Sequence, residues 1–270
     1  MFSFGKNKNG KTTVEAESDI TQKYARAYVI GDVHGCFVEM LTLLIEIKAD
    51  IAKADTGKAV IVFLGDLIDR GPKSKEVLDF LLEYNPNYAD TVFLTGNHEE
   101  VFLNVLAGHV SALQSWFEFG GRSCMRSYGV GNLGEVLSEP ERLLARIQKA
   151  VPKLHVDFVS GFQDYFIYGN FLCVHAGIRP KVPLKKQDSK DMRWIREKFL
   201  TYTKPHPYRV IHGHTIVEEP EVLSNRIGID TGTYNGGMLT AACIVGDDVT
   251  FLQVSSNVNI SAEAVTSLSP

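Results

Sequence analysis

The sequence AVIVFLGDLIDRGP, which spans residues 59–72, decides the fold class of this chain. Its first six residues are all apolar and include several β-branched side chains, a pattern typical of a strand buried on both faces of a sheet. Glycine, aspartate, arginine and proline follow directly, so the strand ends in a polar loop. Apolar residues at helical spacing then predict an amphipathic helix over residues 74–84. A strand, a polar loop and a helix in this order are typical of a βαβ unit.

Two more units of the same kind flank this stretch. A strand over residues 27–30 runs into GDVHG and a helix over 37–47, and a strand over 91–94 runs into TGNHE. Three strand–loop–helix units in succession predict an α/β fold whose first sheet is largely parallel.

The second half of the chain predicts a helical segment and a second sheet. Helical patterns broken by glycines cover residues 101–156, and we interpret them as a mostly helical insertion beside the core. The strands expected after this insertion lie at residues 165–168, 171–174, 209–211, 221–229 and 239–254. They predict a second, mostly antiparallel sheet, so the expected architecture is a sandwich of two mixed β-sheets flanked by helices.

Composition limits the classes to which this protein can belong. The 270 residues are 44% hydrophobic and 22% charged, which is typical of a globular protein and excludes a disordered one. We expect a single domain over residues 23–270 and a flexible tail over the polar residues 1–22. The net charge of −4 argues against general nucleic-acid binding, and no apolar run is long enough to cross a membrane. Four widely separated cysteines without a CxxC pair suggest reduced thiols and a cytoplasmic protein.

Polar residues of metal-binding type stand where the predicted strands end. Ligands of open α/β sheets bind at the carboxyl ends of the strands, so these side chains are expected to meet in one site. The residues are Asp32, His34, Asp66, Asn97, His98, His175 and His214. Hard oxygen ligands mixed with imidazoles suit Mn²⁺, Fe or Zn²⁺, and the set is large enough for two ions that share one carboxylate. Two metal ions are typical of enzymes that hydrolyse phosphate esters.

Taken together, five motifs resemble the motif set of the metallophosphoesterases. They are GDVHG at 31–35, GDLIDRG at 65–71, GNHE at 96–99, HAG at 175–177 and GHT at 213–215. The resemblance is greatest to the phosphoprotein phosphatase (PPP) family in its bacterial and phage form. It implies a metallophosphatase-type sandwich and a metal-dependent serine/threonine protein phosphatase, that is, a phosphoric monoester hydrolase.

The resemblance also implies a role for each site residue. One ion would be held by Asp32, His34 and Asp66, and the second by Asp66, Asn97, His175 and His214. We expect two Mn²⁺ ions, with Fe or Zn²⁺ as alternatives. A metal-bridging hydroxide would attack phosphorus directly, and His98, oriented by Asp69, would act as the general acid.

Arginines are the expected ligands of the substrate phosphate, since a guanidinium group can bind two of its oxygens. The resemblance assigns this role to Arg70 and Asn97, and to a second arginine that we place at Arg196 in the segment Trp194-Ile195-Arg196. Arg193 is the competing candidate. His212 lies two residues before His214 and should point to the opposite side of an extended chain, so it is left out of the metal site.

The resemblance predicts hydrolysis of phosphoserine and phosphothreonine in proteins, with phosphotyrosine as a further substrate class. A symmetrical dinucleoside tetraphosphate hydrolase, or another small-molecule phosphoesterase, is the alternative. In that group the positions of Asp69 and Glu99 commonly carry other residues, which favours the protein phosphatase. A non-catalytic binding module is a third alternative, although no predicted ligand is missing. The expected partner is a phosphorylated protein or peptide, with neither nucleic acid nor membrane, and the oligomeric state is left open.

Overall fold

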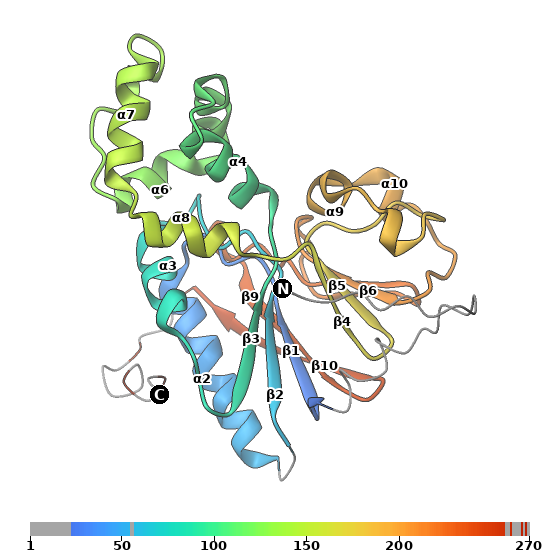
Figure 1. Cartoon of the computed structure of the whole chain (residues 1–270). Coiled ribbons are helices and arrows are strands. Elements are labelled where there is room, and N and C mark those ends of the chain that lie inside the picture. Colours follow the sequence, from blue (N-terminus) through green and yellow to red (C-terminus); the bar gives the residue numbers. More distant parts are fainter. Residues whose placement is uncertain (1–22, 55–56, 257–259, 261–265, 267, 269–270) are drawn as a thin grey trace, which may run out of the picture.

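The computed structural model describes residues 23–54, 57–256, 260, 266 and 268 (Figure 1). The predicted tail over residues 1–22 lies outside the described residues. Two five-stranded sheets form the centre of the protein, in the strand orders β10-β9-β1-β2-β3 and β4-β5-β6-β8-β7. The architecture is the predicted α/β sandwich of two mixed sheets with helices on the outside.

The first sheet contains the three predicted strand–loop–helix units. The strands β1, β2 and β3 pair in parallel, whereas β9 and β10 add to the other side of β1 in antiparallel. Parallel and antiparallel pairings are therefore equal in number, and the expectation of a largely parallel first sheet is wrong, because two strands from the end of the chain complete it. The strands are β1 (Arg26–Ile30), β2 (Ala59–Phe63), β3 (Ala89–Phe93), β9 (Met238–Val245) and β10 (Asp248–Ser255). The apolar run that begins at Ala59 forms β2, which lies between β1 and β3, and every residue of β2 is buried.

The second sheet corrects two expectations. It contains equal numbers of parallel and antiparallel pairings, so it is not mostly antiparallel. Its strands are β4 (Tyr165–Tyr168), β5 (Phe171–Val174), β6 (Arg209–His212), β7 (Glu221–Val222) and β8 (Arg226–Gly228). The predicted strands over residues 239–254 do not join it, because β9 pairs with β1 in the first sheet. Alternation and apolarity identify a strand, but its pairing partner depends on the whole fold.

Helices cover the outer faces of both sheets. The longer ones bury one apolar stripe each; in α2, for example, Met40, Leu44 and Ile47 follow helical spacing and are fully buried. The described α-helices are α2 (Phe37–Lys53), α3 (Ser74–Glu83), α4 (Asn97–Leu106), α5 (Leu113–Trp116), α6 (Arg122–Ser127), α7 (Pro140–Ala150), α8 (Lys153–Ser160), α9 (Ser189–Trp194) and α10 (Glu197–Leu200). The helices α4 to α8 form the expected helical insertion between β3 and β4, and α9 and α10 lie over the second sheet (Figure 1). No helix in the described part of the chain is long and apolar enough to span a membrane.

Three layers of buried side chains hold these elements together. One lies between the first sheet and its helices, one between the two sheets, and one between the second sheet and the segment with α9 and α10. The middle layer brings β1 and β2 against β5 and β6, through Val29 and Val62 on one side and Cys173 and Ile211 on the other. The ends of strands from both sheets therefore come together at one edge of the sandwich.

Candidate metal centre

Most of the non-glycine residues with positive φ in the described chain lie in the loops at this edge. Such residues have φ between 46° and 71° here, in a region that costs energy for any side chain with a Cβ atom. Those in the loops of the site are His34, Asp66, Asp69, Arg70 and His214. Strain of this kind concentrates at functional sites, where the surrounding structure holds it in place.

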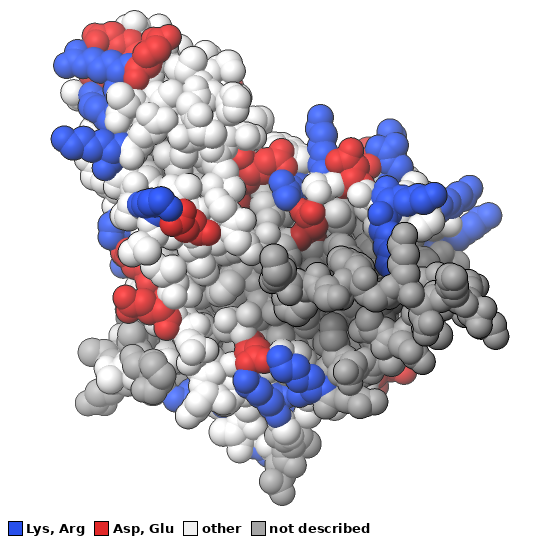
Figure 2. Space-filling view, viewed as in Figure 1, with Lys and Arg blue, Asp and Glu red and all other residues white. Residues whose placement is uncertain are grey.

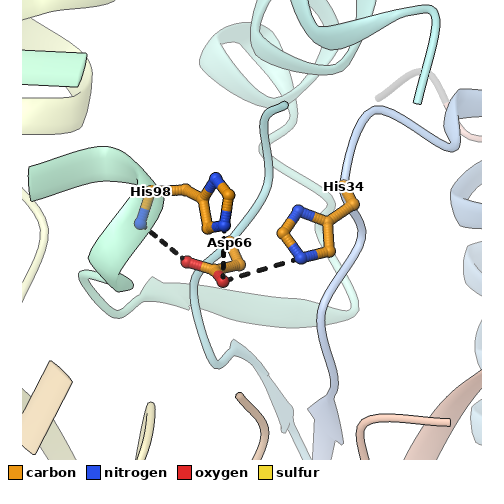
Figure 3. Close-up of side chains that lie close together, drawn as sticks. All are labelled: His34, Asp66 and His98. Atoms are coloured by element: carbon orange, nitrogen blue, oxygen red, sulfur yellow. Dashed lines mark hydrogen bonds and ion pairs between the residues drawn. The ribbon is translucent and has the colours of Figure 1, made fainter. Parts of the chain in front are cut away.

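Asp66 lies at the centre of a cluster of imidazoles. Its Oδ2 atom is 3.6 Å from His34 Nε2, 3.8 Å from His98 Nε2 and 3.5 Å from His175 Nε2. Figure 3 shows His34, from the loop after β1, and His98, from the start of α4, turned toward this carboxylate. Burial alone would raise the pKa of Asp66, but the imidazoles of His175, His98 and His34 hold it well below its usual range. The carboxylate is therefore charged at any physiological pH.

Two groups of buried side chains in the described residues could each hold a metal ion. In each group, one ligand atom from every residue lies within 4.8 Å of the others. The groups are His34, Asp66 and His98, and Asp66, His175 and His214. Asp66 belongs to both, which is the position predicted for the bridging carboxylate.

Backbone carbonyls orient two of the predicted imidazole ligands. His34 Nδ1 lies 2.9 Å from the carbonyl oxygen of Ile68, and His175 Nδ1 lies 3.0 Å from that of Leu64. A carbonyl can only accept, so each Nδ1 carries the proton and each Nε2 offers its lone pair to the cluster. Such outer contacts fix the tautomer of a metal-ligating histidine.

The remaining predicted ligands border the same cluster. Asn97 Oδ1 is 3.0 Å from His175 Nε2, and His214 Nδ1 is 3.2 Å from the same nitrogen. Asp32 is buried nearby, and its carboxylate accepts the backbone N–H of His214 at 3.1 Å. Asp32 belongs to neither three-residue group, so its role as a ligand stays a prediction.

His98 forms the expected pair with Asp69. The Nδ1 atom of His98 lies 2.6 Å from Asp69 Oδ2, and both side chains are buried. Its Nε2 atom faces Asp66, the direction in which a substrate would lie if the cluster bound its phosphate. Burial disfavours the charged imidazole, but the carboxylates of Asp66 and Asp69 outweigh that effect and raise the pKa of His98 to about 9. The imidazole is therefore protonated at neutral pH, as a general acid must be.

The structure distinguishes the two candidate arginines. The guanidinium group of Arg193 is held in ion pairs with Glu100 at 2.9 Å and with Asp164 at 2.6 Å. Arg196 instead lines the cavity beside the cluster, where its guanidinium nitrogens make long contacts, the closest being 3.3 Å from the backbone oxygen of His214. Arg196 is therefore the arginine available to a ligand, and its phosphate-binding role remains a prediction.

The cluster lies in a cavity of about 500 Å³. Arg70 also faces this space, and its guanidinium group packs over the Tyr234 ring at 4.8 Å. The lining residues are Asp32, His34, Asp66, Arg70, Asn97, His98, Phe119, Trp194, Arg196, His214, Thr215, Ile216, Asp230 and Tyr234. Six of the seven predicted strand-end residues line it, and the seventh, His175, lies fully buried behind them.

Comparison with known families agrees with this geometry. Residues 25–237 match the model of the calcineurin-like phosphoesterases. The chain belongs to the calcineurin-like phosphoesterase family. This membership makes it a metal-dependent phosphoesterase and accounts for the fold and for the position of the cluster at the strand ends.

Relatives of this phosphoesterase carry the name of a nucleotide hydrolase. The chain is 29% identical over 239 residues to the bis(5'-nucleosyl)-tetraphosphatase PrpE [asymmetrical] of Anoxybacillus flavithermus, a match that covers 79% of this chain and 88% of the relative. It is also 29% identical to the protein of the same name from Bacillus subtilis, over 78% of this chain and 88% of the relative.

Two solved structures share the fold. One is a putative diadenosine tetraphosphatase, with 21% identity, a TM-score of 0.57 and coverage of 85% of this chain and 94% of that one. The other is a cold-active protein tyrosine phosphatase, with 17% identity, a TM-score of 0.54 and coverage of 86% and 78%. At these identities the similarity shows the fold alone.

Three residues that line the cavity of this phosphoesterase were not predicted from the sequence. Asp230 is buried and lines the cavity, and burial raises its pKa to about 6. It follows β8, so the strand-end rule that found Asp32 would have found Asp230 as well. Phe119 and Ile216 line the mouth of the cavity and are 50% and 48% exposed. Phe119 comes from the π-helical turn Phe117–Gly121 and Ile216 from the loop after β6, and no periodic pattern marks either side chain as part of a site.

Glu99 has a structural role that the sequence did not reveal. Its fully buried carboxylate accepts the backbone N–H groups of Asp66 at 2.7 Å, Leu67 at 2.8 Å and Gly96 at 2.9 Å. Gly96 has to be glycine, because a Cβ atom there would overlap the Asp66 carboxylate. Glu99 thus holds the loop that carries Asp66 and does not itself face the cavity.

The residues present fit a dinuclear metal site. Burial lowers the pKa of His34 to about 3 and that of His214 to about 2, so both imidazoles are neutral and can donate a lone pair. The buried Nε2 of His214 has no hydrogen-bond partner in the described part of the chain. Carboxylate, amide and imidazole donors of this kind accept Mn²⁺, Fe and Zn²⁺ alike, so the donor set does not select one metal.

His212 lies away from the cluster, as the alternation of the strand predicts. Burial lowers its pKa to about 4, whereas an unfolded histidine takes up a proton near pH 6.5. The unfolded state therefore binds more protons below pH 6.5, and the contribution of His212 to stability is lost as the pH falls from 6.5 toward 4. As the pH falls through this window, the free energy of unfolding of the metal-free wild type should decrease, relative to that of His212→Gln, by up to about 1.4 kcal/mol per pH unit. Urea unfolding of both proteins near pH 7 and near pH 5 measures this change. The same difference in free energy of unfolding between the two proteins at both pH values would contradict the prediction.

Proposed function

We propose that this phosphoesterase hydrolyses dinucleoside tetraphosphates. The main support for the proposal is the composition of the cavity. A metal-binding cluster and two guanidinium groups lie inside it. Two half-exposed apolar side chains, Phe119 and Ile216, also line it. A dinucleoside tetraphosphate combines a long polyanion with planar bases at its ends, and both parts find matching chemistry here. The names of the relatives support the same substrate class.

The segment that carries Arg196, one of the two arginines of the cavity, is rich in basic side chains. Residues 179–204 contain nine lysines and arginines against three acidic residues, although the whole chain has a net charge of −4. Figure 2 shows many of these basic side chains gathered on the side of the molecule where α9 and α10 lie. Six lysines of this segment are exposed and form no ion pair within the described part of the chain: Lys181, Lys185, Lys186, Lys190, Lys198 and Lys204. A positive surface beside a site raises the rate at which anionic substrates arrive.

The residues of the site would divide the chemistry among them. Asp32, His34, Asp66, Asn97, His175 and His214 would hold two metal ions, which when bound activate water and neutralise phosphate charge. Arg70 and Arg196 would bind phosphate oxygens and orient the chain of phosphates. His98 would donate its proton to the leaving phosphate oxygen as the P–O bond breaks.

One specific observation favours a second candidate, the hydrolysis of phosphoserine and phosphothreonine in proteins. An alkoxide leaving group requires a proton much more than a phosphate leaving group does, and the 2.6 Å contact between His98 and Asp69 is the arrangement that supplies one. Glu99, the other residue that favours a protein phosphatase on sequence grounds, holds a loop and therefore does not select the substrate.

The two candidates are tested with metal-depleted protein, assayed with and without added Mn²⁺. Diadenosine tetraphosphate is expected to be cleaved only with Mn²⁺, with a kcat/KM about a hundredfold above that for a phosphothreonine peptide. Separation of the products by chromatography then distinguishes ATP plus AMP, the asymmetrical outcome we expect, from two ADP. A higher kcat/KM for the peptide would overturn the proposal in favour of the second candidate.

Phe119→Ala tests the contact with the base. Stacking of a base on an aromatic ring contributes about 1–3 kcal/mol, so the KM for diadenosine tetraphosphate should rise about tenfold. The KM for para-nitrophenyl phosphate, which contains no nucleoside, should change less than about twofold. Leu137→Ala is the matched control, because Leu137 is an exposed apolar residue of the same helical segment that does not line the cavity. An equal rise for both substrates would remove Phe119 from the substrate-binding residues.

A further inference from the structure

A buried tryptophan from the helical insertion contacts the acid pair. Trp116, at the end of α5, is fully buried, and its indole N–H donates to Asp69 Oδ2 at 2.7 Å. The same oxygen lies 2.6 Å from His98 Nδ1. Two donors from two separate segments therefore converge on one carboxylate oxygen, and the carboxylate itself is fully shielded from water.

The insertion also holds the backbone around this carboxylate. Asp69 and Arg70 both have positive φ values, 71° and 63°, and need external contacts to keep that conformation. The carbonyl of Gly120, in the insertion, accepts the backbone N–H of Arg70 at 3.2 Å, and Ser74 Oγ, at the start of α3, accepts that of Asp69 at 3.0 Å. Gly120 has φ 120°, and a Cβ atom there would lie 2.6 Å from Arg70 Cγ. The turn that begins at Trp116 is thus packed directly on the loop that carries the acid pair and the phosphate-binding arginine.

We propose that Trp116 is a positioning residue for the general acid. Its N–H fixes the rotation of the Asp69 carboxylate, and Asp69 in turn holds His98 with Nε2 toward the cavity. A buried carboxylate that loses one of two donors can turn away from the other, and an acid displaced by a fraction of an ångström transfers its proton poorly. This role rests on the proposed function in one respect, because it requires that His98 protonates a leaving oxygen.

The contact can be tested without any catalytic assay. The chain has two tryptophans, so the indole N–H resonances of Trp116 and Trp194 are assigned by NMR with Trp194→Phe. Asp69→Asn is expected to shift the Trp116 resonance and to leave that of Trp194 in place, because Trp194 donates to Glu100. An unchanged Trp116 resonance would overturn the proposal, even if the enzyme has no measurable turnover.

Trp116→Phe tests the consequence for catalysis. It keeps an aromatic ring in the core but removes the N–H donor together with part of the indole, so kcat should fall about thirtyfold for phenyl phosphate and less than about threefold for para-nitrophenyl phosphate, with KM unchanged. The difference arises because the phenolate leaving group needs the proton and the nitrophenolate scarcely does.

The matched control is Tyr128→Phe, which removes another buried donor from the same insertion. The Tyr128 hydroxyl lies 2.7 Å from His155 Nδ1, and neither residue lines the cavity. The positioning role would be overturned if Trp116→Phe lost kcat equally on the two aryl phosphates or on neither. It would also be overturned if Tyr128→Phe showed the same selective loss of kcat on phenyl phosphate. Absence of turnover by the wild type on every phosphate would instead contradict the proposed function, and the NMR experiment would still decide on Trp116.

Discussion

Replacing Asp66 with asparagine should lower the metal content of the protein below two ions and reduce turnover about a thousandfold, or about 4 kcal/mol. Asp66 is the residue common to both groups that could hold a metal ion, and its oxygen lies within 3.8 Å of three imidazoles. Asparagine keeps the shape of the side chain and removes its negative charge, so two cations would have to share a site with no bridging carboxylate.

Metal analysis after exhaustive dialysis, together with circular dichroism to establish the fold, measures this effect. Asp247→Asn is the control for the same chemical change, because Asp247 is exposed and hydrogen-bonded to Asn170 rather than to the cluster. Two full equivalents of metal in Asp66→Asn would show that the ligand assignment is wrong.

Replacing His98 with alanine should reduce turnover of a phosphothreonine peptide about a hundredfold to a thousandfold, and that of para-nitrophenyl phosphate less than about tenfold. The reason is that an alkoxide must be protonated as it leaves, whereas nitrophenolate is a good leaving group without a proton. The 2.6 Å contact with Asp69 and the pKa of about 9 both keep the His98 imidazole charged and oriented for this transfer.

The same variant decides between two roles for His98. Its Nε2 atom is close enough to Asp66 and His34 to act as a metal ligand instead of an acid. As a general acid it should be dispensable for metal binding, so His98→Ala is expected to retain both ions. His109→Ala, which removes an exposed imidazole outside the site, provides the control. Loss of one ion together with equal losses on both substrates would place His98 among the ligands.

The three strand–loop–helix units could be predicted because their signals are local. The apolar run at 59–64, the polar loop after it and the helical spacing that follows are all set by neighbouring residues, and the periods of strands and helices are visible in the sequence. The same local rule placed Asp66, His98 and His175 at strand ends, where the structure brings them together. It also located the helical segment between β3 and β4, although α4 to α8 extend beyond residues 101–156.

Pairings and side-chain partners between distant segments could not be predicted in this way. Residues 239–254 were correctly expected to form strands, yet nothing in them indicates that β9 would pair with β1 rather than with the second sheet. Arg193 and Arg196 are indistinguishable in the sequence, and only the positions of Glu100 and Asp164 show which of them is neutralised.

The sequence by itself determined the class of fold and the metallophosphoesterase superfamily, and it predicted the residues of the centre, because strand ends and motif spacing are properties of short segments. Only the tertiary structure decided how that centre is supported. The contact between Trp116 and Asp69 joins residues 47 positions apart and depends on how a helical insertion packs against a loop. Such packing results from the combined burial of many side chains, and no local pattern in the sequence records it.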